Sequence, residues 1–394
     1  MAGGREGRMR RVGDADVAGK TVLVRVDFNV PIRGTDIQDD ARIRAAVPTI
    51  DLLAGRGARV VLLTHLGQPD GKVVESLRVD PLGARLSELL GRAVRKLDDC
   101  VGDGVEKAIA AGAPGDVFLL ENVRFHRGEE ENAPEFAAAL SALGDLYVND
   151  AFGALHRAHA TMVGLAERLP AFAGLLVEAE IDVLSRLLEA PERPYLAIVG
   201  GKKAESKLGA LSQLASRVDA VLIGGGVAAT FRAALRPDAE ETELVKRLRQ
   251  VDAEARRSGT AIVLPRDAVV APDLRSPEKA VVADVAEVPA GWTGFDIGPA
   301  TVREFEAWIA KARSIVWAGP MGAFEVPPFD AGTRGVAEAV ARSSSFSVIG
   351  GGETGEALAA MGLADRVSFI STGGGACLAY LEGKRLPALA ALGA

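Results

Sequence analysis

The chain has 394 residues, of which 48% are hydrophobic and 25% are charged. At roughly 150 residues per domain, this length predicts two or three domains, and the apolar content excludes a chain that is disordered by default. The formal net charge of −7 argues against nucleic acid as a partner. No apolar run reaches the roughly 18 residues of a membrane-spanning helix, and the basic N-terminal segment leads into no apolar secretory core. The two cysteines, Cys100 and Cys377, form no CxxC site, so we expect a cytoplasmic protein without membrane partners.

Short β-rich apolar runs alternate with Ala- and Leu-rich helical stretches along the chain. Strands are predicted in the first half at residues 22–26, 59–64, 116–120 and 147–149. Strands are predicted in the second half at residues 195–199, 220–223, 261–264, 314–317, 347–349 and 368–371. Helices are predicted at residues 41–54, 134–143, 206–216 and 301–311. Near-continuous apolar runs suit strands buried on both faces of a parallel sheet, so the pattern predicts an α/β fold with two doubly wound parallel-sheet lobes.

One amphipathic helix is predicted at residues 172–190, between the two halves. Its apolar residues recur at heptad-like spacing and form one stripe: Val177, Ile181, Leu184 and Leu188. Prolines precede and follow the segment. We expect it to connect an N-terminal lobe (1–171) with a C-terminal lobe (191–378) that is followed by a tail (379–394). An ordinary packing helix inside one domain is the alternative.

Polar side chains follow each predicted strand of the first half. Ligands gather at the carboxyl ends of the strands in such sheets, and the residues expected there are Asp27, Asn29, His65, Arg124 and Arg157, with Arg42 near the start of the first helix. Each residue alone fits a structural explanation, such as an Asx turn or a solvated charge. Together they suit a small substrate that bears phosphate and carboxylate groups, because guanidinium groups bind both in a bidentate manner.

Glycine-rich loops follow the predicted strands of the second half. Residues 200–207 read GGKKAESK, and further glycine loops occur at residues 224–226, 350–355 and 371–375. Glycines let the backbone approach a phosphate, and the lysines at spacing four lie on one helix face. Tight αβ turns alone would explain any single loop, whereas four in one half favour a nucleotide-phosphate site. Residues 350–355 also match GxGxxG, so an NAD-dependent dehydrogenase is a rival interpretation.

A set of motifs in order along the chain resembles the phosphoglycerate kinase family. They are VRVDFNVP at 24–31, HLG at 65–67, ENVRF at 121–125, NDAFG at 149–153, HRAH at 156–159, DIGP at 296–299, GPMGAFE at 319–325, STGGGA at 371–376 and LEGKRLP at 381–387. The resemblance runs from about residue 22 to the C-terminus, and the combination is highly specific.

The resemblance implies two Rossmann-like lobes that face each other across a hinge, with the C-terminal tail returning to the first lobe. It implies ATP-dependent phosphorylation of 3-phosphoglycerate to 1,3-bisphosphoglycerate in glycolysis, by a monomer. The acid would be held by Asp27, Phe28, Asn29, Arg42, His65, Gln68, Arg124 and Arg157. MgATP or MgADP would be held by Lys203, Lys207, Gly294, Glu325, Gly351, Gly352, Glu353 and Thr354. Arg42 and Lys207 would flank the transferring phosphoryl group, Glu353 would assist Mg²⁺, and hinge closure would exclude water.

Four positions depart from the family pattern. Gln68 replaces an arginine on the substrate side, and Lys202 replaces an alanine. Ala318 replaces an asparagine, and Glu353 lengthens the Mg²⁺ carboxylate by one methylene. These departures keep two alternatives open: a paralogous kinase for a different phosphorylated or phosphonate acid, and an inactive nucleotide-binding protein.

Overall fold

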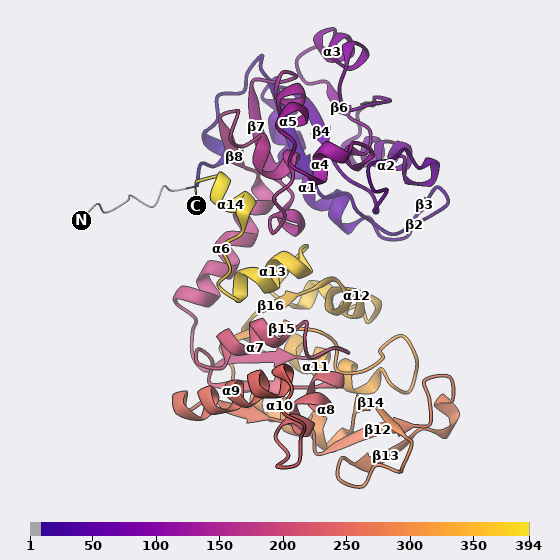
Figure 1. Ribbon diagram of the computed structural model, residues 1–394, viewed down its shortest axis with the longest axis vertical. Coiled ribbons are helices and arrows are strands. Elements are labelled where there is room, and N and C mark those ends of the chain that lie inside the picture. Colours follow the sequence, from indigo (N-terminus) through magenta and orange to yellow (C-terminus); the bar gives the residue numbers. More distant parts are fainter. Residues whose placement is uncertain (1–8, 394) are drawn as a thin grey trace, which may run out of the picture. The chain divides into compact units, whose positions relative to one another are not determined.

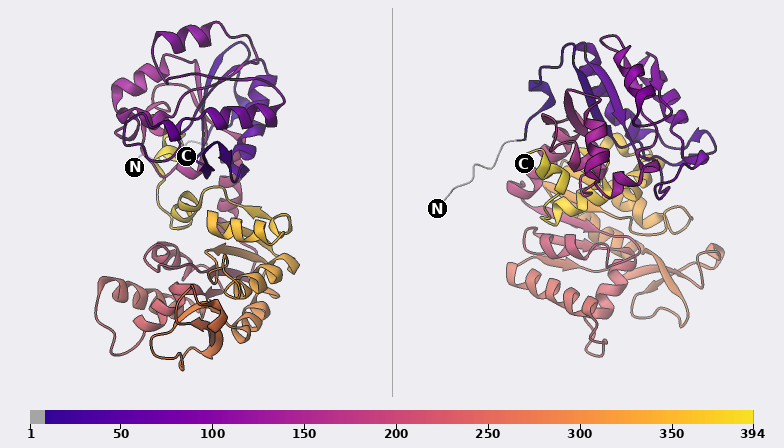
Figure 2. Two further views of the ribbon diagram at one scale, coloured as in Figure 1. Left: turned by 90° about the vertical axis from the view of Figure 1, so that its right-hand side faces the viewer. Right: turned by 45° about the horizontal axis from the view of Figure 1, so that its top comes forward.

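The computed structural model describes residues 9–393, and its internal contacts divide the chain into two units (Figure 1). Unit 1 comprises Met1–Asp182 and Arg385–Ala394, and unit 2 comprises Val183–Lys384. Each unit is built around its own six-stranded parallel sheet, and helices separate most of the successive strands (Figure 2). The predicted α/β class with two parallel-sheet lobes is therefore confirmed.

The sheet of unit 1 has the strand order β5-β6-β4-β1-β7-β8. Its strands are β1 (Thr21–Val26), β4 (Arg59–Leu63), β5 (Val94–Lys96), β6 (Val117–Leu119), β7 (Leu146–Asp150) and β8 (Ala171–Ala173). Its helices are α1 (Ala41–Gly55), α2 (Asp80–Leu90), α3 (Asp103–Ala110), α4 (Arg127–Glu130), α5 (Pro134–Ser141) and α14 (Pro387–Ala391). A short hairpin of β2 (Ile32–Arg33) and β3 (Asp36–Ile37) lies outside the sheet.

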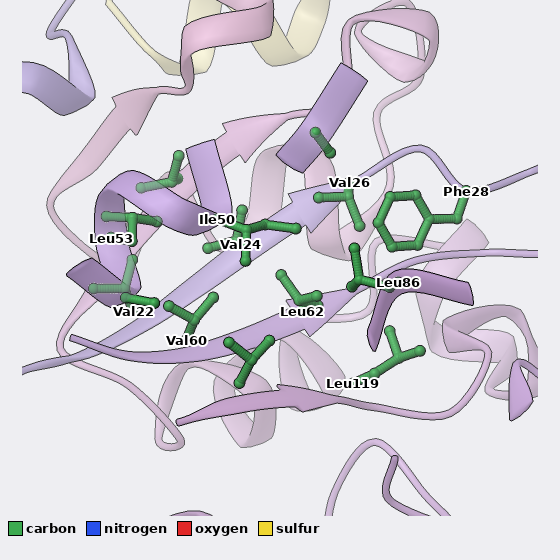
Figure 3. Close-up of a cluster of buried hydrophobic side chains, with 14 of the residues drawn as sticks. Val22, Val24, Val26, Phe28, Ile50, Leu53, Val60, Leu62, Leu86 and Leu119 are labelled. Atoms are coloured by element: carbon green, nitrogen blue, oxygen red, sulfur yellow. The ribbon is translucent and has the colours of Figure 1, made fainter. Parts of the chain in front are cut away.

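The apolar core of unit 1 lies against one face of β1. Alternate strand residues point to the same face, and Val22, Val24 and Val26 pack there with Val60 and Leu62 of β4 (Figure 3). All six residues of β1 are buried, as in a strand covered on both faces. A polar side chain on the other face of β1 is therefore buried as well.

The sheet of unit 2 has the strand order β11-β10-β9-β15-β16-β17. Its strands are β9 (Tyr195–Val199), β10 (Ala220–Ile223), β11 (Ala261–Val263), β15 (Ser314–Ala318), β16 (Phe346–Gly350) and β17 (Phe369–Ile370). Its helices are α7 (Leu208–Leu214), α8 (Gly225–Ala234), α9 (Glu243–Ser258), α10 (Pro299–Ile309), α11 (Ala331–Arg342), α12 (Gly352–Ala360) and α13 (Gly374–Leu381). A second, antiparallel sheet has the order β13 (Val281–Asp284), β12 (Asp267–Ala271), β14 (Thr293–Ile297).

The predicted elements form close to their expected bounds. All ten predicted strands occur within one residue of the prediction at either end, and the four predicted helices outside the connector occur within two residues. The prediction missed the short strands β5 and β8 and the whole antiparallel sheet. Strands β5 and β8 have three residues each and β13 is mostly exposed, whereas β12 is mostly buried and carries an apolar run that the prediction passed over.

The helix predicted at 172–190 begins later than expected. Residues Ala171–Ala173 form β8 beside β7, and α6 spans Leu175–Glu189. The carboxylate of Asp150 accepts hydrogen bonds from the backbone N–H groups of Leu176 (2.9 Å) and Val177 (3.4 Å) and so fixes the start of the helix. A Cβ at Gly174 would lie 2.2 Å from that carboxylate, so only glycine fits the turn.

The unit boundaries differ from the predicted domain boundaries. The division between the units falls inside α6, after Asp182. Helix α13 continues through residue 379, where the tail was expected to begin, and Arg385 is the first residue there that belongs to unit 1. In unit 1, the backbone N–H of Ala388 donates to the carbonyl of Leu155. None of the helices formed by residues 9–393 combines the length and apolar character needed to cross a membrane.

Candidate functional site

Both parallel sheets reverse their direction of growth beside their first strand. In unit 1 the chain passes from β1 to β4 on one side and later adds β7 on the other side. In unit 2 the chain passes from β9 to β10 and later adds β15 on the opposite side. Ligands of open α/β sheets bind at such switch points, outside the carboxyl ends of the strands. The predicted site residues lie largely in loops at these two edges.

The loop after β1 is tied to the first helix of unit 1. Asp27 Oδ1 accepts from the backbone N–H of Asn29 at 3.3 Å, which is the Asx turn that was the structural alternative. Asp27 Oδ2 lies 3.4 Å from Arg42 Nη1, and the same Nη1 donates to the carbonyl of Asn29 at 2.9 Å. The turn therefore also positions the Arg42 guanidinium, which is partly exposed and retains further donors.

The loop after β4 is held from both sides by predicted site residues. Asn29 Oδ1 accepts from the backbone N–H of Gly67 at 2.9 Å, and Arg124 Nη1 donates to the Gly67 carbonyl at 2.7 Å. The buried side chain of Asn122 binds both the N–H and the carbonyl of Leu66. Through these bonds the structure brings Asn29, the loop that begins at His65, and Arg124 together.

Cationic side chains surround His65 and lower its basicity. Burial and the neighbouring charges of Arg25, Arg124 and Arg157 hold the pKa of His65 well below its usual value. Burial and the same arginines lower the pKa of His159 to about 4. Burial and nearby arginines also lower the pKa of Arg124. An anion bound here would relieve this repulsion. The cationic cluster of His65, Arg124, Arg157 and His159 is therefore suited to a negatively charged ligand.

Two predicted acid-binding residues have different surroundings from those expected. The side chain of Phe28 is fully buried in the apolar core (Figure 3), and its backbone N–H donates to Thr64 Oγ1 at 3.0 Å. The side chain and the N–H of Phe28 are thus both occupied within the protein, and its role in acid binding stays a prediction. Gln68 is exposed, beyond the bonded Gly67.

Sequence reasoning missed two buried charged residues beneath the cluster. Arg25 of β1 is 1% exposed, and its Nη2 lies 3.0 Å from His65 Nδ1. Glu129 is fully buried, accepts from the N–H (2.9 Å) and hydroxyl (2.6 Å) of Thr161, and lies 3.8 Å from His159 Nδ1. Burial raises the pKa of Glu129. The sequence signal for these buried charges was the single arginine inside the apolar run TVLVRV.

The glycine loops of unit 2 pack backbone against backbone. A Cβ at Gly226 would lie 2.3 Å from the Lys202 carbonyl oxygen, and a Cβ at Gly319 would lie 2.3 Å from the Gly200 carbonyl oxygen. Gly319 also has a φ of +95°, which disfavours any side chain. The loops after β9, β10 and β15 therefore meet closely.

A cavity of about 460 Å³ opens beside these loops. Its lining includes glycines that follow β9, β10 and β15, Gly294 of β14, and side chains of both charges. The charged and aromatic lining residues are Lys202, Phe295, Phe324, Glu325 and Glu353. A partly apolar cavity with few polar groups is the usual form of a small-molecule site. The predicted residues Gly294, Glu325 and Glu353 are thus brought together, with Lys202 as a further member.

The remaining predicted nucleotide-binding residues surround this cavity without lining it. Burial lowers the pKa of Lys207, the N-cap residue of α7, and the charge of Glu353 opposes this shift. Lys203 is exposed in the same loop, and Gly351 and Gly352 begin α12. Thr354 is fully buried, and its hydroxyl accepts from the Gly319 N–H at 2.8 Å, so its side chain ties two loops together.

The donor set near Glu353 fits Mg²⁺. Glu353 is an exposed carboxylate in the first turn of α12 and lines the cavity. Mg²⁺ prefers oxygen ligands and usually binds one or two carboxylates together with substrate phosphates and water. Glu353 supplies one accessible carboxylate beside a cavity of a size that admits nucleotide phosphates and water, which meets that requirement.

Comparisons with known proteins identify the family. The family model described as phosphoglycerate kinase matches residues 12–384. Phosphoglycerate kinases from Pelotomaculum thermopropionicum and Rubrobacter xylanophilus are 48% and 51% identical, each covering 97% of this chain and 98% of their own. The phosphoglycerate kinase structure from Coxiella burnetii has a TM-score of 0.84 at 37% identity and covers 98% of both chains. The chain therefore belongs to the phosphoglycerate kinase family.

Proposed function

We propose that the chain catalyses the reversible transfer of the γ-phosphoryl group of ATP to the carboxylate of 3-phosphoglycerate. A carboxylate oxygen attacks the γ-phosphorus while the bond to the β,γ-bridging oxygen breaks, and its electron pair leaves with ADP. The product is 1,3-bisphosphoglycerate, an acyl phosphate. Such a reaction places the chain in glycolysis, and we also propose that it acts in the cytoplasm as a monomer.

The observation that carries this proposal is the division of chemistry between the units. The cationic cluster of unit 1 suits an acid that bears phosphate and carboxylate, and the glycine-lined cavity of unit 2 suits a nucleotide. Family membership over residues 12–384 supports this assignment. The GxGxxG match at residues 350–355 follows β16, the fifth strand of its sheet in chain order, rather than the first, which argues against the dehydrogenase alternative.

In unit 1, we assign acid binding to the side chains that retain free donors. Arg42, Arg124 and Arg157 neutralise the anion, since guanidinium donors bind carboxylate and phosphate oxygens. Asn29 and Asp27 fix the loops and orient Arg42. Arg42 then stabilises the equatorial oxygens of the phosphoryl group as it arrives at the carboxylate.

In unit 2, we assign nucleotide binding to the loops around the 460 Å³ cavity. The backbone N–H groups at the start of α12 are directed toward an anion, as at other helix N-termini. Lys207 contacts the γ-phosphate and stabilises charge that develops during transfer. When bound, Mg²⁺ held with Glu353 neutralises charge on the nucleotide phosphates.

The experiment that tests the proposal is ³¹P NMR of the protein with MgATP and a panel of acids. With 3-phosphoglycerate we expect acyl-phosphate and ADP resonances to appear. Formation of an acyl phosphate only with another phosphorylated or phosphonate acid would replace the substrate and retain the reaction class. Absence of phosphoryl transfer to every acid, with MgADP still bound by calorimetry, would leave an inactive nucleotide-binding protein.

A further inference from the structure

The contact between Arg25 and His65 defines the protonation of a histidine in the acid-binding cluster. Arg25 Nη2 lies 3.0 Å from His65 Nδ1, and Arg25 Nη1 donates to the carbonyls of Val26 (2.9 Å) and Leu63 (3.3 Å). Both side chains are buried, at 1% and 5% exposure. The arginine therefore has a fixed orientation relative to the ring.

Hydrogen-bond chemistry then allows one arrangement of protons. A guanidinium group only donates and keeps its charge at all relevant pH values. His65 Nδ1 must therefore accept, which leaves the ring proton on Nε2. A proton on Nδ1 would place two N–H groups against each other in a buried site.

The charges around the ring oppose a second proton. Cationic or ionisable groups face His65 from several segments: Arg25 from β1, Arg124 after β6, and Arg157 and His159 after β7. The opposing carboxylate is Asp27, whose Oδ1 lies 3.9 Å from Nδ1. Within residues 9–393, Nε2 makes no hydrogen bond to another protein group, so its N–H is available to a ligand.

We infer that Arg25 is a positioning residue that fixes His65 as the Nε2–H tautomer, so that His65 gives the acid substrate one neutral and directed donor. The inference rests on the proposed function for the identity of the acid. The arginines of the cluster neutralise the charge of the acid, and the His65 Nε2–H group fixes the orientation of the acid by a hydrogen bond. Acid binding consequently gains nothing from protonation of His65 between pH 5 and 8.

The first test is ¹⁵N and ¹H NMR of the free protein, which has four histidines to assign. We expect His65 to show a protonated Nε2, an unprotonated Nδ1, and no titration between pH 5 and 8. Protonation at Nδ1, or titration of His65 in this range, would overturn the inference. The result does not depend on turnover, so it separates this inference from failure of the proposed function.

The second test uses two variants that each preserve one side of the ring. His65→Gln keeps an N–H donor at the position of Nε2, and His65→Asn keeps only a group at the position of Nδ1. Calorimetry with 3-phosphoglycerate should show at least tenfold weaker binding for His65→Asn than for His65→Gln, with MgADP binding equal in both. Equal acid affinities would overturn the inference.

The third test removes the positioning group. Arg25→Met should raise the pKa of His65 relative to the parent, although burial, Arg124 and Arg157 still oppose a second proton, and it should no longer hold the Nε2–H tautomer, whereas Arg25→Lys, which keeps a donor, should retain it. A His65 ring with the tautomer and the titration of the parent in a folded Arg25→Met protein, by the same NMR measurement, would contradict the role of Arg25. If that variant does not fold, the NMR of the parent and the His65 pair decide the question.

Discussion

The two units use the same edge of a parallel sheet in chemically different ways. At the edge of unit 1, recognition is assigned to side chains: Arg42 and Arg124 are held by hydrogen bonds to loop carbonyls, and His65 is held by Arg25 of β1. At the edge of unit 2, glycines bring the loop backbones together, as at Gly226 against Lys202. A single side-chain change in unit 1 should therefore alter affinity for the acid. In unit 2, an added Cβ should be more damaging than most side-chain changes.

The positions that depart from the family pattern follow the same division. Lys202, Ala318 and Glu353 lie in unit 2, where the loop backbones define the cavity, and Ala318 still accepts the Gly200 N–H through its carbonyl at 3.0 Å. Gln68 lies in unit 1, where the lost arginine would have supplied charge. We therefore expect Gln68 to have the larger effect on substrate affinity.

The largest effect is expected for Lys207→Ala. Removal of one preorganised donor typically lowers kcat by about 10² to 10³, and we expect this loss because Lys207 is assigned to the transferring group. A coupled assay measures turnover, and calorimetry with 3-phosphoglycerate measures acid binding, which should remain unchanged. Lys203→Ala, in the same loop and exposed, is the matched control and should lose about tenfold or less. Joint loss of acid binding and turnover in Lys207→Ala would refute the division of roles between the units.

Arg42→Ala tests the other side of the reaction. We expect a loss of roughly 3 kcal/mol in transition-state stabilisation, about 150-fold in kcat, with MgADP affinity unchanged. Arg44→Ala is the control, because Arg44 lies on the same helix and pairs with Asp40 at 2.8 Å instead of with the acid-binding loops. Turnover of Arg42→Ala within about threefold of the parent would show that its assigned role is wrong.

Gly226→Ala tests the backbone packing of unit 2. The new Cβ would lie 2.3 Å from the Lys202 carbonyl oxygen, so the loops after β9 and β10 must separate. We expect a destabilisation of about 1–3 kcal/mol, the usual cost of overpacking, and weaker MgADP binding with acid binding retained. Gly55→Ala in α1, where a Cβ meets no atom within 4 Å, should change stability by less than about 1 kcal/mol. Equal stability of the two variants, by thermal and denaturant unfolding, would contradict the packing argument.

The sequence predicts the sheets better than the layer of residues around them. Buried parallel strands are continuous apolar runs, so β9 and β10 were predicted with the observed bounds. Strands β12 and β13 belong to an antiparallel sheet, in which Val281 and Val282 of β13 are 48% and 55% exposed, and their apolar runs at 268–271 and 280–283 are short. Their pairing depends on tertiary contacts rather than on local pattern.

The candidate site shows the same limit. The position of Arg124 or Arg157 at a strand end follows from the strand prediction, so sequence reasoning placed both near a ligand. The burial of Phe28 and the layer of Arg25 and Glu129 depend on which face of a strand or turn each side chain occupies. Strand alternation places Arg25 opposite Val24 and Val26, but the burial of Phe28 and Glu129, which lie outside the strands, is set by tertiary packing.

Gln68→Arg restores the charge that unit 1 lacks relative to its family. A charge-assisted hydrogen bond contributes about 1.5–3 kcal/mol and a neutral one nearer 1, so the difference is about 1–2 kcal/mol. We expect KM for 3-phosphoglycerate to fall by about 5- to 30-fold, provided that KM follows Kd. Gln38→Arg, at another exposed position of unit 1, controls for added charge and should have little effect. An unchanged KM in Gln68→Arg would mean that this loop does not contact the acid.

A buried carboxyl group at a helix start gives each unit the same pH dependence. Asp150 lies at the start of α6, and burial raises its pKa to about 7. Asp296 accepts from the Gly332 N–H at the start of α11, and burial raises its pKa to about 8. Above about pH 4 an unfolded chain has lost these protons, while the folded chain keeps them up to the raised pKa. The contribution of these two groups to stability should therefore fall as the pH rises from about 5 to 7, by up to about 1.4 kcal/mol per pH unit for each group, while the lowered pKa values of His65 and His159 act in the opposite direction.

Asp150→Asn should remove the contribution of Asp150 to the pH dependence of stability, because an amide does not titrate. The helix start should be retained, since Asp150 Oδ1 accepts the helix N–H groups and an amide keeps that acceptor. Denaturant unfolding between pH 5 and 8 should show that stability falls less, or rises more, with pH for Asp150→Asn than for the parent, and Asp182→Asn, at an exposed position of the same helix, should follow the parent. An equal pH dependence in the parent and in Asp150→Asn would show that the buried carboxyl is ionised in the folded chain. The helix start would then be stabilised by a carboxylate charge, and the parallel between the two units would fail at this position.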